Sequence, residues 1–173
     1  MKKILLLLLI CFAQSLFAQE TFTYGGFSYT INEKNEITIT MYSSGLSSVD
    51  IPSVIDGKIV TTIGDGAFEG CDSLTSITIP NSVITIGEGA FYRCTSLTSI
   101  TIPDSVTTIG NGAFFDCDSL TSITIPNSVT TIGKNAFYGC TSLTIQCNSG
   151  SYAEKYCEEN NLEYFVTPGW LMD

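Results

Sequence analysis

Four of the seven cysteines in this sequence recur at intervals of 23 residues, which makes them the first candidates for a chemical role. They are Cys71, Cys94, Cys117 and Cys140. Such thiols can form disulfides, bind a metal ion or fill a core as small apolar side chains. Equivalent positions in stacked strands lie about 4.8 Å apart, whereas the Cβ atoms of a disulfide lie about 3.5–4.5 Å apart. A straight column also does not converge on a tetrahedral metal site. We therefore expect a structural ladder of buried thiols with no metal or cofactor; disulfides are the alternative.

Two further cysteines, Cys147 and Cys157, lie outside this series. Cys147 stands where the repeats carry an inward isoleucine, and Cys157 falls on the apolar side of an expected helix. They form either one disulfide or two packed thiols. A bridge over a loop of this length would add about 2–3 kcal/mol of stability.

The sequence contains no histidine, and its charge is strongly acidic. Without imidazole, Ser-His-Asp and Cys-His nucleophile systems and histidine-based zinc sites are excluded. The repeats also do not supply two unlike carboxylates in a pocket, as a glycosidase requires. Seventeen acidic residues against seven basic ones give a net charge of −10, which disfavours nucleic acids and anionic membranes as partners. We therefore expect no catalytic residues and no enzymatic activity.

The cysteines belong to a repeat of 23 residues. Residues 72–94, 95–117 and 118–140 are nearly identical, and the last copy reads DSLTSITIPNSVTTIGKNAFYGC. An earlier copy precedes them and carries an insertion within residues 54–60, where Asp56-Gly57 predicts a turn. Regular repetition of this kind is typical of solenoids.

The pattern within one unit predicts how each coil is built. Ile77 and Ile79 alternate with polar residues as in a short strand. Pro80 ends the strand by removing a hydrogen-bond donor, and Gly87 is expected to permit a positive φ or a close corner. One unit cannot bury its own apolar row, so the units must stack. The expected fold is a β-rich solenoid of the leucine-rich-repeat type with a short parallel sheet on one face.

The N-terminus has the features of a secretory signal peptide over residues 1–18. Lys2 and Lys3 precede a short apolar run, and Ala18 offers a small residue at a cleavage point. The run is about half the ~20 residues that a membrane-spanning helix needs, so we expect no membrane insertion after cleavage. Removal of these residues leaves five basic and 17 acidic residues, a net charge of 5 − 17 = −12.

The remaining chain divides into a solenoid and two caps. Residues 19–45 contain two alternating apolar runs around a polar turn, which predicts a β-hairpin cap. Residues 46–145 form the solenoid of about four coils, and residues 146–173 form a C-terminal cap and tail. A helix expected over residues 151–161 begins with a capping box and has an apolar side that includes Tyr152.

Two outward columns are candidate binding surfaces. The candidate binding face consists of Ser76, Thr78, Ser99, Thr101, Ser122 and Thr124. The candidate aromatic column consists of Tyr92, Phe115 and Tyr138. Exposed aromatic side chains are enriched in interface hot spots. The alternatives are that threonine simply favours strands, and that the rings cover the coil edge by packing on each other.

These surfaces favour a binding module, and a structural spacer or periplasmic scaffold without a specific host ligand is the alternative. Four strands of about six residues would make a face of about 20 by 20 Å, or roughly 400 Å². This is half of the ~800 Å² that each partner buries in a standard interface. Binding through this face alone should therefore be micromolar or weaker.

The consensus SLTSITIPNSVTTIGxxAFxxC closely resembles the BspA-like (Treponema-type) leucine-rich repeats, as do the flanking segments DGKIVTTIGDGAF and SYAEKYCEENNLEYF. The resemblance covers roughly residues 25–165. It implies a right-handed solenoid and a secreted, extracellular or cell-surface location, with the periplasm as another option. It also implies a protein partner, such as host extracellular matrix or another cell-surface protein, and self-association is compatible with it.

Overall fold

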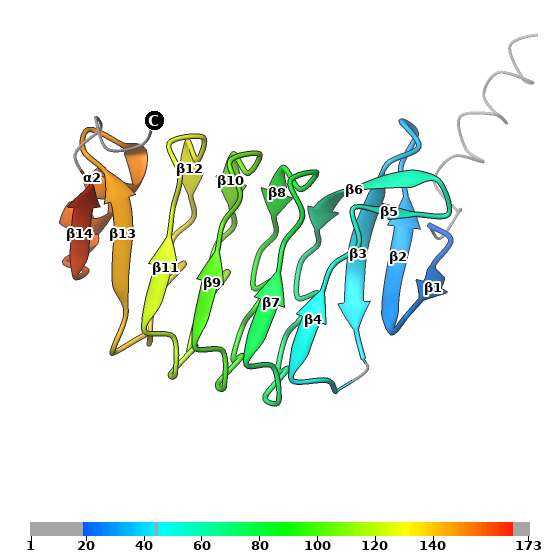
Figure 1. The fold of residues 1–173 in the computed structure, drawn as a ribbon, viewed down its shortest axis with the longest axis horizontal. Coiled ribbons are helices and arrows are strands. Elements are labelled where there is room, and N and C mark those ends of the chain that lie inside the picture. Colours follow the sequence, from blue (N-terminus) through cyan, green and yellow to red (C-terminus); the bar gives the residue numbers. More distant parts are fainter. Residues whose placement is uncertain (1–18, 44, 168–173) are drawn as a thin grey trace, which may run out of the picture.

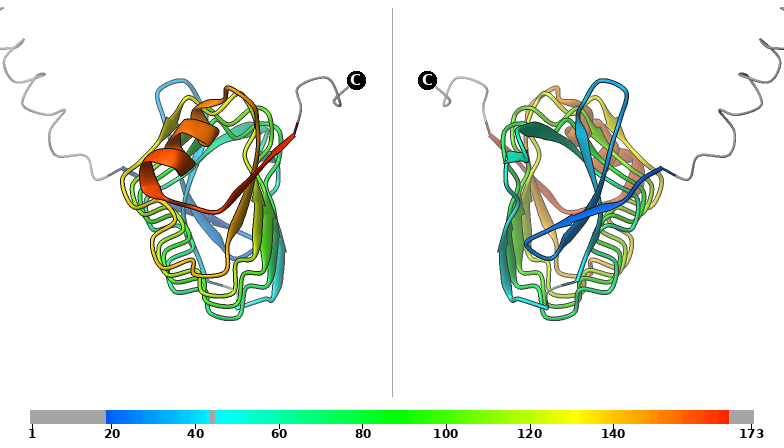
Figure 2. Two further views of the ribbon diagram at one scale, coloured as in Figure 1. Left: turned by 90° about the vertical axis from the view of Figure 1, so that its left-hand side faces the viewer. Right: turned by 90° about the vertical axis from the view of Figure 1, so that its right-hand side faces the viewer.

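The computed structural model describes residues 19–43 and 45–167, which form a β-solenoid whose coils stack along one axis (Figure 1). The fold class predicted from the repeats is confirmed. The end-on views of Figure 2 show successive coils superposed, with the C-terminal helix over one end. The predicted signal peptide, residues 1–18, lies outside the described residues.

The described chain contains short strands and one helix. In chain order they are β1 (Phe22–Tyr24), β2 (Phe27–Ile31), β3 (Ile37–Tyr42), β4 (Ser48–Asp50), β5 (Val54–Ile55), β6 (Lys58–Ile63), β7 (Ser76–Thr78), β8 (Thr85–Ile86), β9 (Ser99–Thr101), β10 (Thr108–Ile109), β11 (Ser122–Thr124), β12 (Thr131–Ile132), β13 (Thr144–Asn148), α2 (Tyr152–Asn160) and β14 (Tyr164–Thr167).

One side of the solenoid is an eight-stranded sheet in the order β1-β2-β3-β6-β8-β10-β12, with β5 paired to β6. From β6 to β12 the strands are parallel and in register. The two runs expected to form a hairpin are β2 and β3, which pair antiparallel, and β3 then runs parallel to β6. The hairpin therefore continues the stack. Strand β1, which pairs with β2 across a turn at Gly25-Gly26, was not predicted.

The opposite side carries the predicted Ser/Thr strands. Here β4 pairs with β7, and β9, β11, β13 and β14 form a parallel sheet. Thr98 N donates to Thr75 O (3.2 Å) and links these two groups. In the repeats each strand has three residues, such as Ser76–Thr78, because a proline follows soon after. The expectation of six-residue strands on this side was wrong.

The third side of each coil is a turn that contains the Ala-Phe pair. Its backbone bonds run from one coil to the next, as from Phe91 N to Ala113 O (2.8 Å). At Gly87 the chain passes so close to the previous coil that an added Cβ would lie 2.8 Å from Gly64 C. Of the two options for Gly87, the structure shows the close corner; the positive φ of this turn belongs to Gly89.

The core consists of columns of identical side chains, and phenylalanine forms its central column. Phe68, Phe91, Phe114 and Phe137 stack with ring centroids 5.1–5.4 Å apart, and each is at most 2% exposed. The column ends on a tyrosine on both sides, with Tyr42 at 5.2 Å from Phe68 and Tyr156 at 6.1 Å from Phe137. The caps thus continue the core column with rings that carry a hydroxyl.

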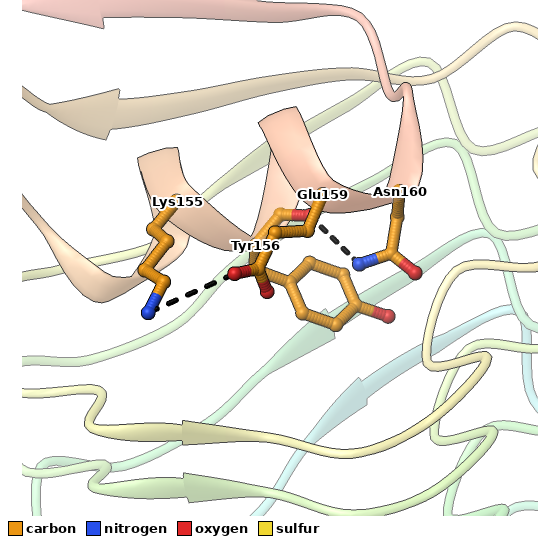
Figure 3. Close-up of polar contacts among 4 residues, drawn as sticks. All are labelled: Lys155, Tyr156, Glu159 and Asn160. Carbon is orange, nitrogen blue, oxygen red and sulfur yellow. Dashed lines mark hydrogen bonds and ion pairs between the residues drawn. The ribbon is translucent and has the colours of Figure 1, made fainter.

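Helix α2 lies over the end of the solenoid (Figure 2), and Figure 3 shows the side chains of Lys155, Tyr156, Glu159 and Asn160 on this helix. The Ser151 hydroxyl accepts from Glu154 N (3.1 Å), which is one half of the predicted capping box; the Glu154 carboxylate accepts from Gly150 N (2.6 Å), one residue before the N-cap, and not from Ser151 N. The Tyr156 hydroxyl accepts from Ala136 N and donates to Gly133 O, both at 3.2 Å. Tyr152 was placed on the apolar side, but its side chain is 44% exposed.

Candidate binding surfaces

The recurring cysteines lie on one side of the phenylalanine column. Cys94, Cys117 and Cys140 are buried, whereas Cys71 in the first coil is only partly buried. Each buried thiol donates to a phenylalanine carbonyl of the preceding coil, as from Cys94 Sγ to Phe68 O (3.1 Å). Burial raises the pKa of Cys94 from 9.0 to about 12. At neutral pH this thiol is therefore protonated and acts as an apolar core side chain that donates one hydrogen bond.

Cys147 on β13 and Cys157 on α2 are both buried. Burial and the neighbouring Cys147 raise the pKa of Cys157 to about 12. Both cysteines are free thiols in this structure. The alternative disulfide between them stays a prediction, which counting of free thiols in the unfolded, unreduced protein tests.

No group of three or more metal-binding side chains comes together within residues 19–43 and 45–167. In the same part of the chain, no helix is long and apolar enough to cross a membrane. The two outward columns are built from neutral side chains.

Hydroxyl groups on the Ser/Thr side of the solenoid fall into two sets with different roles. The inner row is formed by the threonines just before the strands, Thr75, Thr98 and Thr121, and the outer row by the serines and threonines of the candidate binding face. In the inner row, Thr98 and Thr121 donate to the carbonyl of the equivalent threonine one coil earlier, each at 3.2 Å. These bonds reinforce the stack. In the outer row, the hydroxyls of Thr78, Ser99 and Thr101 form no hydrogen bond with any described residue. Donors and acceptors of the outer row are thus available to a ligand.

The candidate binding face follows this outer row. Ser122 also has no described hydrogen-bond partner, whereas Ser76 donates to Ser48 Oγ (3.0 Å) and Thr124 to Gln146 Oε1 (3.4 Å). A shallow depression of about 340 Å³ runs along β7 and β9. The face is therefore polar, nearly flat and open.

The structure extends this face beyond the predicted residues. Strand β14 pairs parallel to β13, and the register aligns Thr124, Gln146 and Phe165 in one row across three strands. Phe165 is 60% exposed. The sequence predicted a cap and tail over residues 146–173, and nothing in it showed that a strand of this tail would join the Ser/Thr side. This exposed aromatic side chain was therefore missed.

The three residues of the aromatic column pack on each other. The ring centroids of Tyr92 and Phe115 lie 5.4 Å apart, and those of Phe115 and Tyr138 lie 4.8 Å apart. Tyr92 and Phe115 are half-buried, whereas Tyr138 is 62% exposed. The rings therefore pack on each other and are still accessible to a partner, and the last ring, Tyr138, is the most exposed of the three.

A groove of about 440 Å³ lies beside the aromatic column. Its polar wall contains Glu88, Asn111 and Lys134, one from each of three coils. The Asn111 side chain donates to Glu88 Oε2 (3.2 Å) and accepts from Lys134 N (3.0 Å). The groove combines ring edges with fixed polar groups, an arrangement that suits non-covalent binding.

Comparison with known proteins places these features in a family context. Residues 39–169 match the family model described as "BspA type Leucine rich repeat region (6 copies)", a span that extends beyond the predicted solenoid at both ends. No curated protein matches the chain.

Two solved structures cover most of the chain. A leucine-rich repeat protein from Bacteroides capillosus ATCC 29799 is 35% identical over 75% of this chain and 99% of its own, with a TM-score of 0.68. The leucine-rich repeat protein TpLRR of T. pallidum is 30% identical over 87% of this chain and 84% of its own, with a TM-score of 0.60.

Proposed function

Because the chain belongs to the BspA-type leucine-rich repeat family, we propose that it is a protein-binding or adhesion module that bacteria secrete or display on their surface. The observation that carries this proposal is the contrast between the two rows of hydroxyls. The inner row is used to join the coils, as from Thr121 to Thr98 O. In the outer row, the hydroxyls of Thr78 and Thr101 have no described partner, although Thr124 at the end of the row donates to Gln146.

The aromatic column supports the same proposal as a second contact surface. Tyr138 presents a largely exposed ring, and Tyr92 and Phe115 line the adjoining groove. Rings that are already stacked lose little conformational freedom on binding, so their contact area costs little entropy. The proposed partner is a protein, such as a host extracellular-matrix component or another cell-surface protein.

The dimensions of the Ser/Thr face set the expected affinity. The face spans six strands, from β4 to β14. At about 4.8 Å per strand and 3.3 Å per residue, it measures roughly 29 by 10 Å, or about 290 Å². This is little more than a third of the ~800 Å² per partner in a standard interface. We expect micromolar or weaker monovalent binding. Several linked copies of the protein, or additional contacts from the aromatic column, would strengthen it.

The test is binding of residues 19–173 to a panel of immobilised extracellular-matrix proteins. The face variant carries Thr78→Gln, Thr101→Gln and Thr124→Gln. The matched control carries the same change at Thr85, Thr108 and Thr131, which lie in register on the opposite sheet.

We expect the wild type and the control to bind one of these proteins equally, and the face variant to bind at least about tenfold more weakly. If the wild type binds none of them, or if both variants lose affinity equally, the proposal is wrong. Fractionation of the producing cells tests the location separately: the protein is expected in the medium or at the cell surface.

A further inference from the structure

The outer edge of β14 is a second feature that the molecule leaves open. Strand β14 ends the sheet that runs through β9, β11 and β13, and no strand of the described chain pairs with its other side (Figures 1 and 2). Edge strands present unpaired backbone groups that can pair with another chain.

The pairing with β13 shows which groups point outward. Ile145 N donates to Glu163 O (3.0 Å), and the register pairs Ile145 with Tyr164. In a parallel pair, the N–H and C=O groups of one residue point to the same side of the strand, and those of the next residue point to the opposite side. Because Glu163 and Phe165 face β13, the backbone groups of Tyr164 and Val166 face away from it. The register with β13 therefore leaves both amides on the open side of the strand.

The other sheet ends differently at the same end of the solenoid. Helix α2 packs against β12, β13 and β14, and its Tyr156 hydroxyl bonds to Gly133 O and Ala136 N of the last coil, just after β12. The helix thus satisfies backbone groups beside β12, whereas no described hydrogen bond joins it to the backbone of β14. Tyr164–Thr167 also contains no charged residue, although charges are a common means of protecting an edge.

The surroundings of this edge are acidic and carry one exposed aromatic ring. Residues 141–167 contain four glutamates and a single lysine, Lys155, which pairs with Glu159 (3.7 Å). Glu163 is exposed beside the strand, and Glu158 accepts from the Tyr164 hydroxyl (3.3 Å). Phe165 lies within the strand and is 60% exposed, so it can pack against a side chain on an added strand.

We propose that β14 is the docking strand for an extended, positively charged segment of a partner protein, which adds to the sheet as a further strand. The backbone of Tyr164 and Val166 would supply the hydrogen bonds, Phe165 the apolar contact, and Glu163 and Glu158 the charge selectivity. This inference rests on the proposed binding function, because it names the class of partner. A second copy of this chain is a poorer fit, since it would bring the same acidic residues together and carries a net charge of −10.

The test uses a short capped peptide of alternating lysine and valine, with a counterpart in which glutamate replaces lysine. Binding to residues 19–173 is followed through the backbone amide signals in NMR spectra. The variant Val166→Pro removes the outward N–H but no bond to β13, and Val166→Thr is the matched control that keeps this N–H. Thermal unfolding establishes that both variants are folded, and the NMR map of the wild type provides an independent result.

We expect the lysine peptide to shift the amides of Tyr164 and Val166, and the glutamate peptide to leave them unchanged. Val166→Pro should weaken binding at least about tenfold, and Val166→Thr by less than about twofold. Equal binding to both variants, shifts confined to another surface, no saturable binding of the lysine peptide, or self-association through β14 would each overturn the inference. The Thr→Gln face variant should still bind the peptide, so a failure of the matrix-binding proposal is distinguishable from a failure of this one.

Discussion

Replacing Phe114 by alanine should destabilise the protein far more than the same change at the next residue, Phe115. Phe114 is 0% exposed, and its ring lies between those of Phe91 at 5.2 Å and Phe137 at 5.4 Å. Truncation of a buried phenylalanine costs about 3–5 kcal/mol, and each aromatic pair contributes about 0.5–1.5 kcal/mol beyond burial. Because Phe114 has two such partners, we expect a loss of about 5 kcal/mol.

Phe115 is the matched control because it has the same side chain and the same kind of neighbours, but is only half-buried. Full burial of a phenylalanine contributes about 1.5–3 kcal/mol, so Phe115→Ala should cost about 1 kcal/mol. Phe114→Leu keeps most of the volume and should cost about 1.5 kcal/mol.

Urea unfolding of residues 19–173 under reducing conditions measures these differences. With a slope of about 2 kcal/mol per molar urea, Phe114→Ala should lower the midpoint by about 2.5 M and Phe115→Ala by about 0.5 M. If Phe114→Ala loses less than about 2 kcal/mol, or if Phe115→Ala is the more damaging change, the stacked column is not the main support of the core.

Three further changes test the stack, the cap and the thiols. Gly110→Ala should cost about 1–3 kcal/mol, because its Cβ would lie 2.6 Å from Glu88 N; thermal unfolding measures the loss. Tyr156→Phe should cost about 1–3 kcal/mol in the same assay, because it leaves the Gly133 carbonyl and the Ala136 amide without the hydroxyl. Because the folded-state pKa of Cys94 is raised from 9.0 to about 12, its contribution to stability is fully present below pH 9 and is lost between pH 9 and 12. The free energy of unfolding, measured by urea titration, should therefore fall above pH 9 by up to about 1.4 kcal/mol per pH unit from this group, and less steeply in Cys94→Ala.

Each of these three predictions can be contradicted by a specific result. A Gly110→Ala protein as stable as the wild type would show that the coils do not approach as closely as described. An unchanged Tyr156→Phe protein would mean that water or another group replaces the hydroxyl. Identical pH profiles for the wild type and Cys94→Ala would show that this thiol is not shielded from solvent.

The sequence alone was sufficient for the fold class and for the contents of the core. A repeat of 23 residues places the same side chain at the same point of every coil, so Phe91 must lie over Phe68, and Cys94 over Cys71. The outward serines and threonines follow from the same repetition. These features depend only on the register between neighbouring coils, which the repeat length sets.

Features that break the repetition were accessible only in the tertiary structure. Whether a threonine hydroxyl joins the coils, as in Thr98, or stays available, as in Thr101, depends on its distance from a carbonyl of the previous coil. The position of Phe165 on the Ser/Thr side depends on how β14 pairs with β13 after the chain has passed through a helix. Long-range pairing of this kind leaves no periodic signal in the sequence, because it occurs once. The repeat therefore determined the solenoid, and the tertiary structure decided which of its edges and hydroxyls are left for a partner.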